Sequence, residues 1–450
     1  MNGAATLAFV AALAVLPASK PAVASCDLRI TGAGPCRPDG AAGNPLVGEP
    51  YALRVNVRVT GVPSAPFRIR WKIAANTHDF AAISVGEGDF TWTFRRQVAL
   101  DGPMPWSVSI DPEHVSGDTD WSNNAAAGKL TPTPPKAAME NYEPRIMRGW
   151  EEIAVRYAPD SGAIGWLDFC FGLPTTHTTQ EVLEAPGPAG GIAVTTSPFG
   201  LPASEIARRN PSPRAFQDAQ SFTVRLWNVR VNPGKLRRAG WAGLGKLKPE
   251  IARWTQSEAE IQSAHAEIAA FAAASLPTGF RKAIAPYDAA RVLHQAVMKH
   301  MTYTLKHPGD GALGALRNGW GDCGYYSYLL IACLRNIGIP ARPTAGWWEG
   351  TNQWHMWVEL YLPGGGWIVA DPTVGDQESP DGLYAYQFGY VPNANSRCSV
   401  TLAATNIMPS HAYGHLQVPN WYWSGTAKWL GTEHQCRLLP APKEADTGTP

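Results

Sequence analysis

The chain has 450 residues and a formal net charge of +1, with 38 Lys and Arg against 37 Asp and Glu. No long run of either sign occurs, so the broad basic surface of a nucleic-acid-binding protein is not expected. Charged residues make up only 17% of the chain, while Gly (44) and Pro (39) are frequent. This balance favours β-rich domains with many loops over helical bundles, and the length predicts about two to four domains.

The first residues predict export. Residues 7–16 form an apolar stretch that Pro17 ends, and small residues then lead to a cleavage site after Ala24. The stretch is too short to cross a bilayer, which needs about 20 apolar residues. We therefore interpret residues 1–25 as a signal peptide and expect a secreted or periplasmic protein. No later segment predicts a transmembrane helix.

Cys26 suggests an alternative to free secretion. With the preceding Val-Ala-Ser, it makes a sequence that resembles a bacterial lipobox, in which the cysteine becomes a lipidated N-terminus. Lys20 interrupts the approach to this site. We therefore favour plain secretion over lipid anchoring through Cys26.

The cysteine count fits an exported protein. An odd number of cysteines in an oxidising compartment predicts one thiol that stays free and six that are available for disulfides. Cys323 is our candidate for the free thiol. Cys26 with Cys36, and Cys398 with Cys436, are the natural local pairs, although a sequence does not fix connectivity. The seven cysteines are Cys26, Cys36, Cys170, Cys323, Cys333, Cys398 and Cys436.

Residues 26–135 predict a β-sandwich followed by a Pro-rich linker. Apolar and polar residues alternate in several short stretches, as is typical of strands with one buried face. These stretches are Tyr51–Val59, Phe67–Ile73, Phe90–Phe94 and Trp106–Ile110. The end of the segment, residues 107–124, resembles the final strands of bacterial immunoglobulin-like adhesion modules. Such a module binds a partner or acts as a passive spacer.

The next two segments differ in periodicity. Residues 136–255 predict a further β-rich element packed on the core that residues 256–380 would form, with strands over Glu152–Tyr157 and Ser221–Trp227. Helical periodicity begins in residues 256–380. It predicts one helix over Ser257–Ala274, where Ser257 and Glu260 are spaced as a capping box, and a second over Asp288–Met301.

Residues 381–450 form an aromatic-rich C-terminal extension. The run Asn420-Trp-Tyr-Trp and the later Trp429 could stack on sugar rings, but packing on the core is the favoured interpretation because Trp is usually largely buried. The composition of residues 441–450 predicts disorder.

Cys323 is predicted to begin a helix. It follows the glycine-broken loop Asn318-Gly-Trp-Gly-Asp, and Gly324–Ile337 then has the pattern of a mostly apolar helix. The unpaired amides of a helix N-terminus favour a thiolate, and Asp322 can cap them. Cys333 lies on the same helix, roughly 15 Å away along its axis, which is too far for a disulfide to Cys323.

A β-hairpin is predicted to bring a histidine and an aspartate together. His355–Leu362 alternates as a strand, Pro363–Gly366 is typical of a turn, and Trp367–Asp371 returns. A hairpin centred on Pro363 would place His355 directly opposite Asp371, where a carboxylate can hold an imidazole. A register shift by one residue would move Asp371 to the other face.

These three residues suit nucleophilic catalysis. A cysteine at a helix start, a histidine on a strand and an aspartate on the next strand supply a nucleophile, a base and a group that orients the base. Taken singly, each is more often structural, and a buried cysteine especially so. The hypothesis therefore rests on their combination as catalytic residues Cys323, His355 and Asp371.

The surrounding motifs resemble the transglutaminase-like superfamily over residues 285–376. They are Gly321-Asp-Cys-Gly, Ser327–Ala341, His355-Met-Trp-Val-Glu and Gly366–Thr373. The resemblance implies a papain-like α+β core and assigns nucleophile, base and orienting acid to Cys323, His355 and Asp371. It also implies a structural role for Arg342. Met356 departs from the usual small residue, but it points into the apolar face of its strand.

The implied reaction is attack of a thiolate on a carboxamide or peptide carbonyl, giving an acyl-thioester on Cys323. The backbone amide of Cys323 and a second donor would stabilise the oxyanion. Trp320 is a candidate for that donor, and a packing role for it is equally compatible with the sequence. Transfer to water would make a peptidase or deamidase, which we slightly favour, and transfer to an amine would make a protein crosslinker.

The expected partner is a protein or peptide substrate, with cell-wall peptide as one option, and the oligomeric state stays open. The alternative is a noncatalytic surface or adhesion protein that uses the same fold as a scaffold. No cofactor is expected. His294, His300, His307 and Cys333 are the candidates for a zinc site, but the spacings typical of zinc sites are missing.

Overall fold

The structure is a computed structural model. It describes residues 25–37, 43–46, 51–73, 76–80, 82–96, 103–158, 162–185, 193–196, 202–209, 215–351, 354–373, 387–391, 394–401 and 420–441. These residues fall into two compact units. The smaller lies within Met1–Gly34, Arg54–Thr93 and Pro105–Lys129, and the larger within Pro35–Leu53, Phe94–Met104 and Leu130–Pro450. The division into five segments that the sequence suggests stays a prediction.

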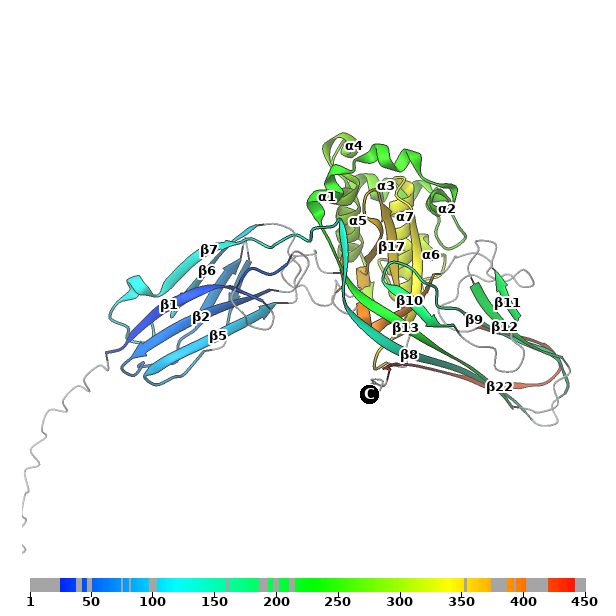
Figure 1. Ribbon diagram of the computed structural model, residues 1–450, viewed down its shortest axis with the longest axis horizontal. Helices are drawn as coiled ribbons and strands as arrows, with labels where there is room; N and C mark the ends of the chain where they lie inside the picture. Colours follow the sequence, from blue (N-terminus) through cyan, green and yellow to red (C-terminus); the bar gives the residue numbers. More distant parts are fainter. Residues whose placement is uncertain are drawn as a thin grey trace, which may run out of the picture. The chain divides into compact units, whose positions relative to one another are not determined.

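The N-terminal strands form two sheets, in the orders β1-β2-β5 and β4-β3-β6-β7 (Figure 1). The alternating stretches of the sequence lie in these strands, and their apolar positions, such as Val55, Val57, Trp71 and Val108, are buried. The strands are β1 (Asp27–Cys36), β2 (Tyr51–Thr60), β3 (Ile69–Ile73), β4 (Asn76–Asp79), β5 (Gly88–Arg96), β6 (Met104–Ile110) and β7 (Ala125–Leu130), with a 3-10 turn at Trp121–Asn123. The immunoglobulin-like identity of this region stays a prediction.

The expected disulfides are not formed among the cysteines whose side chains are described. No disulfide is formed by Cys26, Cys36, Cys398 or Cys436, or by Cys323 or Cys333. The predicted pairing of Cys26 with Cys36 is wrong because β1 is an extended strand between them, and ten residues at about 3.3 Å each separate its ends by roughly 30 Å. The Cys26 thiol instead donates to the Ser116 carbonyl oxygen at 3.3 Å. The pairing of Cys398 with Cys436 is likewise absent, although both are buried.

The larger unit contains two sheets that surround the predicted site. One has the order β10-β13-β8-β22, with β19 also paired to β13, and the other has the order β18-β17-β16-β20. A third sheet has the order β11-β12-β9-β21 (Figure 1). Its strand β9 follows β8 of the first sheet along the chain. The strands are β8 (Met139–Tyr157), β9 (Ile164–Gly172), β10 (Gln180–Glu184), β11 (Ala193–Thr196), β12 (Pro202–Arg209), β13 (Ala215–Val231), β14 (Thr302–Tyr303), β15 (Trp320–Gly321), β16 (Ala341–Trp348), β17 (Trp354–Leu362), β18 (Gly366–Ala370), β19 (Tyr390–Val391), β20 (Arg397–Thr401), β21 (Asn420–Gly425) and β22 (Trp429–Pro440).

The helices gather around α7, which packs on β16 and β17 and contacts α3, α5 and α6. They are α1 (Pro233–Arg238), α2 (Pro249–Ala252), α3 (Ala266–Ser275), α4 (Phe280–Ala283), α5 (Pro286–His300), α6 (Gly311–Asn318) and α7 (Cys323–Asn336), with 3-10 turns at Trp241–Lys246, Arg253–Thr255 and Ala394–Ser396. The predicted second helix and the helix after Cys323 thus correspond to α5 and α7. Because α7 is covered on all sides, nearly all of its residues are buried.

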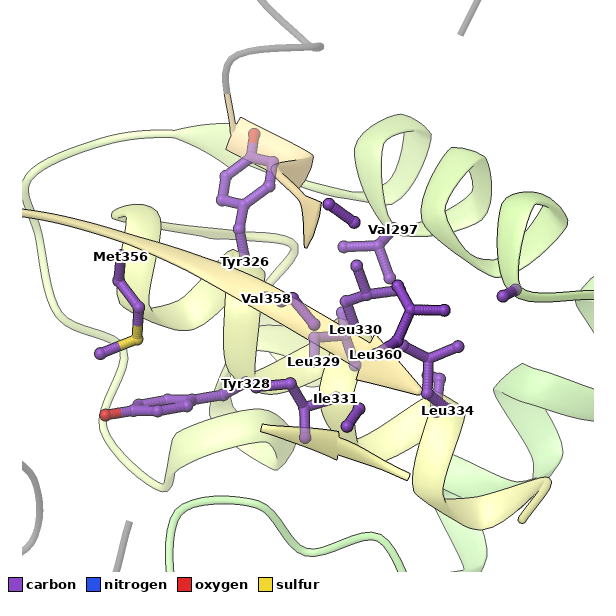
Figure 2. Close-up of a cluster of buried hydrophobic side chains, with 14 of the residues drawn as sticks. Val297, Tyr326, Tyr328, Leu329, Leu330, Ile331, Leu334, Met356, Val358 and Leu360 are labelled. Atoms are coloured by element: carbon purple, nitrogen blue, oxygen red, sulfur yellow. The ribbon is translucent and has the colours of Figure 1, made fainter. Parts of the chain in front are cut away.

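The main hydrophobic core lies between α7 and the face of β17 (Figure 2). Met356, Val358 and Leu360 alternate on the core side of β17, as the sequence predicts, and each is at most 1% exposed. Val358 and Leu360 lie beside Leu330 and Leu334 of α7, and Met356 lies at the end of the cluster near Tyr328. Burial of this size, at roughly 1.5–3 kcal/mol for each large apolar side chain, fixes the start of α7 against the sheet that carries His355.

The predicted helix over Ser257–Ala274 begins nine residues late. It starts at Ala266, with His265 as its N-cap. The expected capping box does not form because the Ser257 hydroxyl donates to the Ile261 carbonyl at 3.3 Å. The neighbouring Glu258 forms an ion pair with buried Arg335 of α7 at 2.5 Å. A tertiary contact therefore replaces the local helix start.

The C-terminal aromatic residues divide into packed and exposed ones. Trp423 of β21 is partly buried and meets Tyr157 edge to face at 5.2 Å, whereas Trp429 is 48% exposed. Of the predicted disordered tail, residues 441–450, all but the first lie outside the described residues, and the Ala441 amide donates to the Ile146 carbonyl at 2.9 Å. Among the residues that are described, no helix is long and apolar enough to cross a membrane.

Candidate active site

Cys323 is the first residue of α7, as predicted. Asp322 is the N-cap, and its Oδ1 accepts from the amides of Gly324 at 2.9 Å and Tyr325 at 3.3 Å. Gly321 makes this tight turn possible, since a Cβ there would lie 2.5 Å from the Tyr325 side chain. The Cys323 side chain lies where a helix N-terminus stabilises negative charge, and the residue is 9% exposed.

His355 lies near the start of β17 and faces Gly346 of β16 in the strand register. A Cβ at Gly346 would come within 2.0 Å of the Cys398 carbonyl oxygen, so glycine allows β16 and β20 to approach here. The imidazole lies between two indoles, with ring centroids 5.3 Å from Trp348 and 5.9 Å from Trp357. These contacts limit the orientations that the ring can adopt.

The predicted hairpin forms, but its register is shifted. β17 and β18 pair Leu362 with Gly366 and Val358 with Ala370, so the hairpin is centred on Gly364 rather than on Pro363. Continued by one residue, this register sets Asp371 opposite Trp357, and the predicted direct pairing with His355 is wrong. Because the shift is two residues, both side chains stay on the same face and meet as diagonal neighbours.

Asp371 is completely buried, and several groups bind its carboxylate and its backbone. Its Oδ2 accepts from His355 Nε2 at 2.7 Å and from Arg397 Nη1 at 2.6 Å, and its Oδ1 accepts from the backbone amide of Thr373 at 3.1 Å. Its own backbone amide donates to the Gln387 carbonyl at 2.8 Å. The carboxylate is therefore held from several sides.

The charges at this site reinforce one another. Burial alone would raise the pKa of Asp371, but His355 and Arg397 outweigh burial and hold that pKa well below its usual range. Burial alone would lower the pKa of His355, but Asp371 and the Cys323 side chain raise it to about 9. The imidazole is therefore protonated at neutral pH, between an anionic carboxylate and the sulfur.

The Cys323 and His355 side chains are hydrogen-bonded to each other. Because Asp371 occupies Nε2 of the ring, Nδ1 is the nitrogen that remains for the sulfur. The structure thus brings together all three residues that the sequence singles out. The order along the contact is Asp371, His355, Cys323.

Sequence reasoning missed Arg397. It is 3% exposed, binds the same carboxylate oxygen as His355, and lies over the Trp348 ring at 4.2 Å and near the Trp357 ring at 5.7 Å. It follows Asp371 by 26 residues, beyond a stretch without clear periodicity. A basic residue at the start of a short strand after the hairpin was the only signal, and many surface arginines share it.

Tyr303 was also missed, and it lies on the strand beside that of Trp320, the candidate oxyanion donor. β14 and β15 pair in parallel, with Tyr303 beside Gly321 and Thr302 beside Trp320. Burial raises the pKa of the Tyr303 phenol, and Cys323 and Asp322 raise it further, so this phenol is within electrostatic range of the Cys323 side chain. Tyr303 therefore stays protonated at neutral pH.

The strand that carries Arg397 is fastened to the β-rich element. The side-chain amide of Gln180 donates to the Ser399 carbonyl at 2.9 Å and accepts from the Ser399 amide at 2.8 Å. His177 hydrogen-bonds the Ser399 hydroxyl at 2.8 Å. Residues of the 136–255 segment thus help to hold the wall of the site.

A second buried charge cluster lies on the same sheet. Glu359 is fully buried and binds Arg342 at 2.7 Å and His177 Nδ1 at 3.2 Å. Arg342 lies over the Trp367 ring at 4.0 Å, which is a structural contact. Burial alone would raise the pKa of Glu359, but Arg342 and His177 lower it well below its usual range.

The residues weighed for zinc do not converge. His294 is buried against Phe388 with ring centroids 5.4 Å apart, His300 hydrogen-bonds the Leu316 carbonyl at 2.7 Å, and the His307 side chain is 64% exposed. Within the described ranges, no group of three or more His, Cys, Asp or Glu side chains is arranged to hold a metal ion.

Comparison with known families supports a transglutaminase-like domain. Residues 274–372 match the family model of the transglutaminase-like superfamily, and members of this superfamily are cysteine enzymes. The matched residues include Cys323, His355 and Asp371 and span α5, α7 and the β16–β18 strands. The chain is thus a β-rich multidomain protein with a transglutaminase-like core.

Individual relatives cover parts of the chain. A protein-glutamine gamma-glutamyltransferase from Pseudomonas aeruginosa is 29% identical over 187 residues, which are 37% of this chain and 25% of that protein. The Bacillus subtilis protein YebA is 34% identical over 71 residues, 12% of this chain and 10% of that protein. The chain thus spans a quarter or less of the length of these curated relatives. A crystal structure from Cytophaga hutchinsonii, named a candidate cysteine protease, covers 68% of this chain and 94% of its own at 14% identity and a TM-score of 0.47.

Proposed function

We propose that this protein is an exported cysteine enzyme that acts on amide bonds of a peptide or protein through an acyl-thioester on Cys323. His355 is the acid-base group and Asp371 orients it. One observation carries the proposal: the His355 imidazole is bound by buried Asp371 at 2.7 Å on Nε2 while it also hydrogen-bonds the Cys323 side chain.

Acylation follows from this geometry. Because His355 is protonated, the thiol proton has already passed to Nδ1, and the resulting thiolate adds to the carbonyl carbon of the amide. The backbone amide of Cys323, at the helix start, can donate to the oxyanion, and the Tyr303 phenol and the Trp320 indole are candidates for the second donor. When the C–N bond breaks, the proton on His355 goes to the leaving nitrogen, which departs as ammonia or an amine.

The second half of the reaction decides the product. Water attacking the thioester releases an acid and restores the thiol, so the protein acts as a peptidase or deamidase. An amine attacking it forms a new amide and crosslinks two chains. We favour hydrolysis, and the name of the Pseudomonas relative supports transfer to an amine as the alternative.

The direct test is incubation of the mature chain with a peptide library, with and without added primary amine, followed by mass spectrometry. Hydrolysis adds the mass of one water, about 18 Da, to each cleaved peptide pair, or converts a carboxamide to an acid. Transfer appears as the mass of the amine minus ammonia. The C323A variant is the control. A wild-type chain that gives none of these products in any peptide context would sink the proposal.

The rival scaffold hypothesis is tested by thiol labelling. Burial raises the pKa of Cys333 and of Cys436 to about 12, and that of Cys398 well above its usual value. These thiols are therefore poor targets for iodoacetamide at neutral pH, whereas a thiol paired with a protonated imidazole is a good one. Rapid alkylation that C323A abolishes supports the enzyme. Labelling at the rate of an ordinary thiol supports a noncatalytic surface protein.

Export rests on residues 1–24, which lie outside the described residues. The burial of Cys26, at 2% exposure, supports free secretion over a lipid anchor on its sulfur. The backbone amide of Cys26 also donates to the Gly117 carbonyl at 3.4 Å. Expression of the full chain and mass analysis of the processed form test this: we expect an N-terminus near Ser25 without added lipid, and unprocessed chain in the cytoplasm would contradict it.

A further inference from the structure

We propose that Arg397 is a positioning residue of this site, which holds Asp371 in one orientation and offsets part of its charge so that His355 can release its proton. The inference rests on the proposed function, since it assigns a role within the same reaction. It adds a fourth member to the three residues that the sequence suggests.

Arg397 and His355 donate hydrogen bonds to the same oxygen atom of Asp371. Both bind Oδ2 of Asp371, at 2.6 Å and 2.7 Å. The other oxygen, Oδ1, is taken by the Thr373 amide at 3.1 Å. Rotation of the carboxylate would break these contacts together, so its plane is fixed, and with it the direction from which His355 is held.

Arg397 is itself held firmly. Its guanidinium lies over Trp348 at 4.2 Å and near Trp357 at 5.7 Å. The same two indoles flank the His355 ring. Gln180 holds the strand of Arg397, because its side chain hydrogen-bonds both the backbone carbonyl and the backbone amide of Ser399. The arginine and the histidine therefore approach Asp371 from neighbouring positions within one aromatic wall.

The charge of Arg397 has a direct consequence for proton transfer. A buried carboxylate with no other cation would bind the imidazolium tightly and make His355 a poor acid. A permanent cation on the same oxygen weakens that attraction, because the guanidinium repels the imidazolium at short range. It also keeps Asp371 ionised when His355 has given up its proton.

Other ionisable groups near the pair are few in the described structure. Cys323 faces His355 from α7, with Asp322 beside it. His294 of α5 hydrogen-bonds the backbone of Asp371, and Arg291 is near His294; burial lowers the pKa of His294 to about 4 and lowers that of Arg291. His294 is thus neutral near pH 7 and above, which leaves Arg397 as the permanent cation bound to the carboxylate.

Arg342 provides a matched control. It also binds a fully buried carboxylate on the same sheet, that of Glu359, at 2.7 Å, and it also lies over a tryptophan, Trp367, at 4.0 Å. Replacing either arginine removes a buried ion pair and a cation–π contact. Only Arg397 shares its carboxylate with the histidine that binds Cys323.

The experiment measures the rate of iodoacetamide alkylation of Cys323 against pH, with C323A subtracted, in the full mature chain. The upper inflection of this profile reports loss of the His355 proton. We expect R397M and R397Q to move it up by roughly 1 to 2 pH units, because a neighbouring positive charge is lost. R397K should leave it in place, and R342M should do the same.

A turnover assay adds a second readout once a substrate peptide is known. We expect kcat to fall by about 10- to 100-fold in R397M, the effect of losing a hydrogen bond between charged groups, with KM little changed and partial recovery in R397K. R397Q keeps a donor and serves if R397M does not fold. An unmoved inflection in R397M and R397Q, or an equal shift in R342M, would overturn the inference.

The two claims fail in different ways. If no peptide is turned over by the wild-type chain while the alkylation profile shifts as expected, the proposed function fails and the role of Arg397 stands. If peptides are turned over and the alkylation profile does not shift, the proposed function stands and the role of Arg397 fails.

Discussion

Two charge clusters on one sheet have almost the same composition. Asp371 is buried with His355 and Arg397, and the arginine lies over a tryptophan. Glu359 is buried with His177 and Arg342, and that arginine also lies over a tryptophan. In both, the cations hold the pKa of the carboxyl well below its usual range against the effect of burial.

The difference lies in what the histidine meets on its other side. His355 contacts the Cys323 side chain at the start of α7, whereas His177 contacts the Ser399 hydroxyl in the middle of a network of backbone contacts. A buried carboxylate with a histidine and an arginine is therefore not by itself a catalytic arrangement. The sulfur at the helix tip makes the distinction.

The substitution Cys323→Ala tests the difference between the two clusters most directly, because it removes the sulfur that only His355 contacts. We expect turnover of any substrate peptide to fall by about 10⁴-fold or more, because the covalent intermediate is lost. The free energy of unfolding should change by only about 1 kcal/mol, since one small side chain is truncated. Residual turnover above a tenth of the wild-type rate would mean that Cys323 is not the nucleophile.

Asp371→Asn should produce the next largest effect. The asparagine amide carries no charge, so it does not stabilise the imidazolium, and when its N–H donates to Nε2 of His355 it holds the wrong tautomer. We expect kcat to fall by roughly 10³- to 10⁴-fold. Steady-state kinetics near neutral pH measure it, and a folded variant with near-normal kcat would contradict the assignment of Asp371.

Glu359→Gln is the matched change in the other cluster. It leaves Arg342 without its buried counter-charge, which costs about 3–5 kcal/mol in typical proteins. We expect the midpoint of urea unfolding to fall clearly, while kcat of the folded fraction stays within about threefold. A loss of kcat comparable to that of Asp371→Asn would show that the two clusters act as one.

The smallest effect concerns His294, behind Asp371. Burial lowers its pKa to about 4 from an ordinary 6.5, so the unfolded chain takes up the proton first as the pH falls. Its contribution is therefore fully present above pH 6.5 and is lost progressively down to about pH 4, by roughly 3 kcal/mol. Unfolding free energies between pH 7 and 4 should depend less on pH in H294L.

Local signals predicted much of the fold. Alternation identified β2, β3, β6 and β17, and helical spacing identified α5 and α7 with the cap at Asp322, because in these elements the buried face alone sets the pattern. The helix start at Ser257 was misplaced because Glu258 is taken by Arg335, a residue 77 positions later. A helix prediction from a short stretch of sequence does not include a contact with a residue so far along the chain.

The site was predictable in its residues and less so in its geometry. Cys323, His355 and Asp371 were found from a helix tip and a hairpin, although the hairpin centre is Gly364 rather than Pro363. Four adjacent residues with three glycines allow several turns, so the sequence could not choose among them. The position of Arg397 at the site could not be predicted from local sequence, because its strand pairs with β16, which lies far from it along the chain.

The amide of Gln180 does more than hold the wall of the site. β20 is an outermost strand of its sheet, and such a strand exposes backbone groups to which a foreign chain can add. By giving Ser399 both a donor and an acceptor, Gln180 takes the place of a neighbouring strand at that residue. The contact that steadies Arg397 thereby also blocks a position where aggregation could begin.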